Sequence, residues 1–172
     1  MTNHKSPITN LQLGFTLIEL LVVISIIGAL ASLFLISFVG VQKSGRDTQR
    51  KSDLKQYQTA LEQFANLNNG FFPSRKAAGG VTAHTTLCAD LSMTNCPKDP
   101  RYDTDTSYNY LYSTDGTSLG TVDATAYVLW GLLEKPDTDT YWVLCSDGKA
   151  GEVESGTSGM PPDSNPGGEC PL

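Results

Sequence analysis

Glu19 is the residue whose chemistry stands out, because it is a carboxylate at the start of a long apolar stretch. Residues 14–19 read GFTLIE, and no charged residue follows from Leu20 to Val41. A carboxylate in such a setting is costly to bury and is by default a functional position that needs a partner. Hydrolysis after Gly14 would supply one, because the new α-amine of Phe15 would carry a positive charge one helical turn from Glu19. Between staggered copies of the chain, the same pair could form in trans.

Four cysteines all follow the apolar stretch and form the second group with clear chemistry. An even number confined to one part of the chain indicates two disulfides formed in an oxidising compartment. We favour Cys88–Cys96 and Cys145–Cys170 because they are neighbours in sequence, although spacing alone leaves all three connectivities open. Metal binding is the alternative, but there is no C-x-x-C pair and the only nearby histidine is His84.

Two short acidic pairs could hold a cation. Asp103 and Asp105 flank one threonine, and Asp137 and Asp139 flank another. Alternating carboxylates in loops can gather around calcium. An Asp/Thr-rich turn is the alternative, and we favour it, so calcium is a candidate ligand at these four residues and no other cofactor is expected.

Enzymatic chemistry has little support in the sequence. His4 lies near the amino terminus and His84 in a loop, and neither a G-x-S-x-G motif nor a Gly-rich phosphate loop is present. Residues 1–80 carry eight Lys/Arg and four Asp/Glu, whereas residues 81–172 carry four and fourteen. Because nucleic-acid affinity rests largely on Lys and Arg, the acidic half argues against direct nucleic-acid binding. We therefore expect neither catalysis nor nucleic-acid binding.

The elements that must position Glu19 begin with a short polar segment, residues 1–14, which has the form of a cytoplasmic leader. The uncharged run up to Val41 is long enough to cross a hydrocarbon core of roughly 30 Å as a helix, so we expect a transmembrane or filament-core helix half over 15–42. The basic residues that follow this run outnumber those before it. The charge bias alone therefore opposes a cytoplasmic leader. We override it because the cysteines and the acidic part of the chain belong outside the cell.

The helix is expected to continue as an amphipathic half over 43–70. Apolar and polar positions recur there at three- and four-residue spacing, which is typical of a helix with one buried stripe. Asn69-Gly70 and the following Pro73 supply a stop signal. The stripe consists of Leu54, Tyr57, Leu61, Phe64 and Asn68.

The remaining residues, 71–172, are expected to form a globular head. Residues 71–106 are rich in Gly, Ala, Thr, Asp and Pro and are interpreted as a connecting loop. An antiparallel sheet is predicted over 107–146, because three runs rich in Tyr, Val, Leu and Trp alternate with turn signals. The expected strands are 107–113, 124–132 and 140–146. Residues 147–172 would form a carboxy-terminal loop that Cys170 ties to the strand carrying Cys145. The fold class is α+β, a helix packed on a small antiparallel sheet.

At residues 14–19 the sequence resembles the type IV pilin family, which includes the pseudopilins of type II secretion. The resemblance implies that Gly14 precedes the prepilin peptidase cleavage site, that Phe15 becomes the N-methylated first residue, and that Glu19 guides assembly. The layout of the rest is also similar to the family: an amphipathic helix, a variable connection, an antiparallel sheet and a disulfide-closed loop.

The resemblance also implies partners and a location. The expected partners are further copies of the chain, a prepilin peptidase, an inner-membrane platform protein and an assembly ATPase. The chain would cross the inner membrane once before assembly and lie in an extracellular pilus afterwards. Adhesion, twitching motility, DNA uptake and secretion are all compatible roles.

Three alternatives remain open. The first is a type II secretion pseudopilin, although the acidic, disulfide-closed carboxy-terminal part favours a surface pilus. The second is an extracellular binding module held by one membrane helix, which would leave Glu19 unexplained. The third is an ordinary secretory signal peptide cleaved after Ala31. Against this third alternative, Glu19 interrupts the apolar region and the apolar stretch continues past Ala31.

Overall fold

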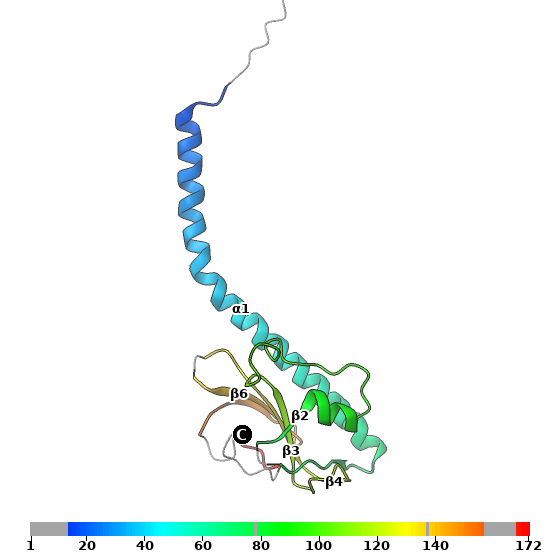
Figure 1. The fold of residues 1–172 in the computed structure, drawn as a ribbon. Helices are drawn as coiled ribbons and strands as arrows, with labels where there is room; N and C mark the ends of the chain where they lie inside the picture. The colour runs from blue at the N-terminus through cyan, green and yellow to red at the C-terminus, as the bar shows by residue number, and fades with distance from the viewer. Residues whose placement is uncertain (1–13, 78, 137, 157–167) are drawn as a thin grey trace, which may run out of the picture. The chain divides into compact units, whose positions relative to one another are not determined.

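A computed structural model describes residues 14–77, 79–136, 138–156 and 168–172, without the side chains of residues 33–37 (Figure 1). The chain divides into two compact units, one up to Gly40 and the other from Val41 to Leu172. Helix α1 (Leu17–Leu67) contributes to both units. Each unit is described separately below.

In the first unit, α1 has apolar side chains on all sides. Phe15, Leu17 and Ile18 are exposed, and so are the described apolar residues of the following turns up to Leu30. A helix that is apolar all round requires a cover from other chains or from lipid.

A membrane-spanning helix half was expected for residues 15–42. Within the described part of the chain, no helix is long and apolar enough to cross a membrane.

In the second unit, one stripe of α1 is buried. Leu54, Tyr57 and Leu61 have no exposed surface, as the spacing predicts. The next buried residue is Ala65, whereas Phe64 is half-buried. The predicted stripe is therefore correct up to Leu61 and shifts by one position afterwards.

Helix α1 ends at the predicted stop signal. Asn69 and Gly70 have positive φ angles of 57° and 86°, in the left-handed region that Asn and Gly tolerate best. The Gly70 N–H donates to the carbonyl of Ala65 at 2.8 Å, which satisfies one of the free carbonyls at the helix end.

The head contains a five-stranded antiparallel sheet with the order β2-β3-β5-β6-β7. A separate pair joins β1 to β4. The α+β prediction is therefore confirmed. The strands are β1 (Phe72–Pro73), β2 (Val81–Thr82), β3 (Tyr110–Thr114), β4 (Val122–Ala124), β5 (Tyr127–Leu132), β6 (Thr140–Cys145) and β7 (Ala150–Glu154).

The two faces of this sheet have different covers. Tyr110, Tyr112 and Leu129 point to the buried stripe of α1 and form the main core with it. The alternate residues of the strands, including Trp130 and Val143, form a second apolar cluster with Cys170 on the opposite face. The period of two along each strand therefore places one set of side chains under the helix and the other under the carboxy-terminal residues.

Three details of the head differ from the sequence predictions. The predicted loop 71–106 contains β1, β2, a π-helical turn (Ala83–Leu87) and the short helix α2 (Cys88–Asp90). The predicted strand over 124–132 is two strands, β4 and β5. The predicted loop 147–172 begins with β7, which pairs with β6 from Thr140↔Glu154 to Leu144↔Ala150.

Candidate functional site

Glu19 is hydrogen-bonded to Thr16, just before the first residue of α1. The Thr16 N–H and the Thr16 hydroxyl donate to Oε2 of Glu19 at 2.9 and 2.8 Å. The Glu19 N–H donates to Oγ1 of Thr16 at 3.3 Å. This reciprocal arrangement is a capping box, which satisfies N–H groups that have no partner within the helix. In this structure Glu19 therefore has a partner in its own chain.

The side chains around Glu19 form a shallow apolar hollow of about 360 Å³. Phe15, Ile18, Val22 and Val23 line it together with Glu19. Phe15 is 88% exposed. The carboxylate thus lies at the edge of an apolar surface, where a cationic group brought by another chain would be held between apolar side chains.

At the predicted cleavage position, the structure describes Gly14 and the residues that follow it. Gly14 lies within the described residues, and a side chain at this position would meet nothing within 4 Å. The proposed leader, apart from Gly14, lies outside the described residues. Cleavage after Gly14 and methylation of Phe15 remain predictions.

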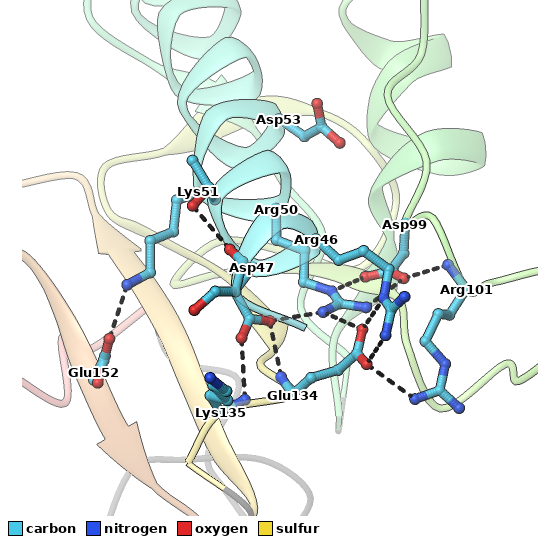
Figure 2. A network of polar contacts seen from close by, with 12 residues as sticks. Arg46, Asp47, Arg50, Lys51, Asp53, Asp99, Arg101, Glu134, Lys135 and Glu152 are labelled. Carbon is cyan, nitrogen blue, oxygen red and sulfur yellow. Dashed lines mark hydrogen bonds and ion pairs between the residues drawn. The ribbon is translucent and has the colours of Figure 1, made fainter. Parts of the chain in front are cut away.

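A second polar cluster, between α1 and the head, was not predicted (Figure 2). Its centre is Arg50, whose side chain has no exposed surface. Nε of Arg50 lies 2.6 Å from Oδ2 of Asp99, and Nη1 lies 2.7 Å from Asp47 and 2.8 Å from Glu134. The Tyr108 ring lies 4.8 Å from the guanidinium carbon. Burial acts to lower the pKa of Arg50, but the hydrogen bonds and charges of its acidic partners outweigh burial and raise this pKa above its ordinary value.

Glu134 connects Arg50 with two further arginines. Nε and Nη2 of Arg46 donate to Oε1 and Oε2 of Glu134 at 2.6 and 2.5 Å. Nη1 of Arg101 lies 3.4 Å from Oε2 of Glu134. The hydrogen bond from Arg46, with further help from Arg50, lowers the pKa of Glu134 to about 2. Asp47 accepts the backbone N–H groups of Glu134 and Lys135 at 2.8 and 3.0 Å. The cluster therefore joins α1 to two connecting segments of the head.

The sequence contained a partial signal for this cluster. Asp47 and Arg50 are three positions apart on a helix, a spacing at which opposite charges meet. The other partners could not be inferred, because Asp99 lies 49 positions from Arg50 and Glu134 lies 88 positions from Arg46. The basic residues after the apolar run thus serve partly as internal ion-pair partners.

Both predicted disulfides are present. Cys88 is bonded to Cys96, and Cys145 is bonded to Cys170. No cysteine of the described residues is free. One group of possible metal ligands, Cys145, Asp147 and Cys170, occurs in the described part of the chain. Cys145 and Cys170 are bonded to each other in a disulfide, so their sulfurs are not thiolates and are poor metal ligands.

The calcium candidates occupy different surroundings. Asp103 binds Lys98 at 2.8 Å through both carboxylate oxygens, and Asp105 accepts hydrogen bonds from Ser107. The carbonyl of Asp139 accepts the N–H of Ser155. Asp137 lies outside the described residues. Calcium binding remains a prediction.

Comparisons with known proteins agree with the amino-terminal motif. A family described as the prokaryotic N-terminal methylation motif matches residues 9–35. The type IV major pilin protein PilA of Myxococcus xanthus (strain DK1622) is 41% identical over 51 residues, which is 30% of this chain and 23% of that pilin. The matched stretch therefore spans less than a quarter of the relative's length. No solved structure matches the chain. The methylation motif and the similarity to a type IV pilin both lie in a limited part of the chain, and the disulfide-bonded helix-on-sheet fold is consistent with them.

Proposed function

We propose that this chain is the structural subunit of a type IV pilus. The peptide bond after Gly14 is hydrolysed by a prepilin peptidase, and Phe15 becomes the N-methylated first residue. The chain is held in the inner membrane by its apolar run before assembly. Copies then polymerise with their apolar helix segments inside and their heads outside, with no chemistry of their own.

The observation that carries this proposal is the apolar surface around Glu19. The described apolar side chains of α1 up to Leu30 are exposed, and Glu19 is the one carboxylate among the described residues of this apolar surface. Packing of several such helices would remove that surface from water. The α-amine of Phe15 in a neighbouring copy would then be available to Glu19 in place of Thr16.

Intact mass and amino-terminal sequencing of protein sheared from cells test processing and assembly together. The expected product begins at N-methylated Phe15 and gains four hydrogens on reduction of its two disulfides. An amino terminus at Ser32 would indicate a signal peptide instead. An uncleaved Met1 would indicate a membrane-anchored module.

A matched pair of variants tests the role of the carboxylate. In Glu19→Gln the hydrogen-bond acceptor to Thr16 is retained but the negative charge is lost. We expect normal cleavage after Gly14 and no sheared filament. In Ser25→Ala the change also lies on α1, but no charge is lost, and filaments should form. Normal assembly of Glu19→Gln would exclude the proposed charge pairing.

Surface pilus and secretion pseudopilus differ in where the filament lies. The proposal of a pilus rests on the similarity to a major pilin and on the acidic, disulfide-closed head. Filaments that extend from cells expressing the chain at its native level are expected. Filaments confined to the cell envelope, together with loss of a secreted protein on deletion of the gene, would favour the pseudopilin alternative.

A further inference from the structure

The head contains a groove between α1 and the loop closed by the first disulfide. One wall is the part of α1 from Gln56 to Leu67, including Gln63 and Phe64, and the other is the segment 91–95. The groove has a volume of about 480 Å³. Leu67 at its margin is 86% exposed. An open, partly apolar hollow of this size next to an exposed leucine is a candidate contact surface.

The second wall of this groove is held in place by covalent and hydrogen bonds. The disulfide Cys88–Cys96 closes the loop that contains the segment 91–95. The N–H groups of Ser92 and Met93 donate to the carbonyls of Ala89 and Cys88 at 3.1 Å. A wall that is already ordered loses little conformational freedom when a partner binds.

The groove also differs from the rest of the head in charge. None of its lining side chains is charged: they are amides, hydroxyls and the apolar side chains of Ala60, Phe64, Leu67, Leu91 and Met93. The whole chain has a net charge of −6, so two copies repel each other over most orientations. An uncharged surface is where a second copy can approach without that repulsion.

The same head carries a protruding loop of matching character, residues 116–122, which we call the knob. Its sequence GTSLGTV contains no charge. Leu119 is 78% exposed and Val122 is 43% exposed. The knob is therefore an uncharged loop with an exposed leucine at its tip, and the groove is a hollow with an uncharged lining of mixed polar and apolar side chains. Charged groups lie at the base of the knob, where Arg75 lies against Gly120 and Asp123 binds Ser74.

Buried Ser74 holds the knob in a fixed conformation. The Ser74 N–H donates to the carbonyl of Thr121 at 2.7 Å, and the Gly120 N–H donates to the carbonyl of Ser74 at 2.8 Å. The N–H of Thr117 donates to Oγ of Ser74 at 3.1 Å, and the Ser74 hydroxyl also binds Asp123. The tip that carries Leu119 is thus rigidly presented, although the leucine itself has no cover.

We propose that the groove binds the knob of a second copy of this chain, with Leu119 seated between α1 and the segment 91–95. Because the two surfaces consist of different residues, each copy can offer its knob to one neighbour and its groove to another, and the contact can repeat. The proposal rests on the proposed function in that a filament would contain this contact. It adds a head-to-head specificity that the apolar helix segments alone do not supply.

Cross-linking tests the contact directly. Copies carrying Leu119→Cys are mixed with isotope-labelled copies carrying Gln63→Cys, and disulfides are mapped by mass spectrometry in full-length assembled protein. We expect a 63–119 cross-link between labelled and unlabelled copies. Labelled Ser52→Cys is the control, because Ser52 is exposed on α1 outside the groove. A 63–119 yield no higher than the 52–119 yield would overturn the proposal.

Charge substitution gives a second, independent test. Leu119→Glu should weaken self-association of the full chain in detergent by roughly tenfold or more, because it replaces an apolar contact with a carboxylate that has no cationic partner in the groove. Gln63→Lys in the same chain should restore part of the loss, whereas Ser52→Lys should not. Sedimentation measures the association, and circular dichroism checks the fold.

The outcomes separate this proposal from the proposed function. If sheared filaments begin at Phe15 and Leu119→Glu associates like the unchanged chain, the groove contact is excluded and the pilus subunit stands. If no filament forms, sedimentation of the detergent-solubilised chain still decides. Association weakened by Leu119→Glu and rescued by Gln63→Lys supports the contact, and the absence of self-association excludes it.

Discussion

Arg50 and Asp99 are joined by two hydrogen bonds although 49 positions separate them in the sequence. Nε and Nη2 of Arg50 lie 2.6 and 3.1 Å from the two carboxylate oxygens of Asp99. The side chains of both residues are fully buried. The pair therefore fixes the segment after the first disulfide against α1, beside the core that α1 forms with the sheet.

Asp99→Ala should destabilise the head strongly. The substitution leaves the Arg50 guanidinium buried with fewer partners, and breaking a buried ion pair typically costs about 3–5 kcal/mol. Urea unfolding of the oxidised chain, followed by near-ultraviolet circular dichroism, measures the change. Asp103→Ala is the matched control, because the Asp103 side chain is 76% exposed in its pair with Lys98 and an exposed pair contributes about 0–1 kcal/mol. Equal losses for the two variants would contradict a special role for burial.

The stability of the head should fall at acidic pH through Glu134. Its pKa is about 2 in the folded chain, against an ordinary value of 4.5. A lowered folded-state pKa means that the stabilisation is complete above the ordinary pKa and is lost as the pH falls from about 4.5 towards about 2. The full difference corresponds to up to about 3 kcal/mol.

Glu134→Gln isolates this contribution. The variant should be less stable than the unchanged chain near neutral pH and should approach it as the pH falls to about 2, because the charge that distinguishes them is then lost. The free energy of unfolding, measured for both across this range, checks the prediction. A constant difference at every pH would show that Glu134 acts through its shape and not through its charge.

The two disulfides should differ in their effect on stability. Cys145 and Cys170 are 25 positions apart, whereas Cys88 and Cys96 are 8 apart. From the entropy of closing these loops in the unfolded chain, we expect losses of about 3.5 and about 2.5 kcal/mol when each pair is replaced by serine. Thermal unfolding of the two paired variants compares them, and reduction of the unchanged chain gives the combined effect. A larger loss for the shorter loop would refute this ranking.

Thr16 should determine how firmly α1 begins. Thr16→Val removes the hydroxyl that donates to Glu19 and accepts the Glu19 N–H, so the amide protons of Leu17, Ile18 and Glu19 should exchange faster. Thr16→Ser keeps the hydroxyl and should exchange at a rate close to that of the unchanged chain. Hydrogen exchange of the full chain in detergent measures both. Unchanged exchange in Thr16→Val would mean that the capping box does not hold the helix end.

Features set by local sequence were predictable. Leu54, Tyr57 and Leu61 lie at helical spacing and are buried, and Asn69-Gly70 supplies the left-handed residues at which the helix ends. Tyr110 and Tyr112 alternate with Leu111, and the structure places the two tyrosines on one face of β3 and Leu111 on the other. Both disulfides follow the order of the cysteines in the sequence.

Features set by long-range contacts were not predictable. Strand β7 has the sequence AGEVE, and its glycine and two glutamates give little strand propensity, so pairing with β6 decides its conformation. The capping box at Thr16 had a local signal, a threonine followed three residues later by a glutamate, but Glu19 was interpreted as an assembly carboxylate alone. The assembly role of Glu19 remains a proposal, and it is compatible with the capping box because the carboxylate could exchange Thr16 for a cation from another chain.

The buried cluster around Arg50 also has a mechanical consequence. A force applied along α1 is transmitted to the segment between β5 and β6 through the ion pairs of Arg46 and Arg50 with Glu134. It reaches the segment after the first disulfide through Asp99. These ion pairs would therefore resist part of the pulling force, in addition to the apolar contacts between helix and sheet. If the chain is pulled, these ion pairs would hold the head to α1, and their strength depends on how well water is kept out of the cluster.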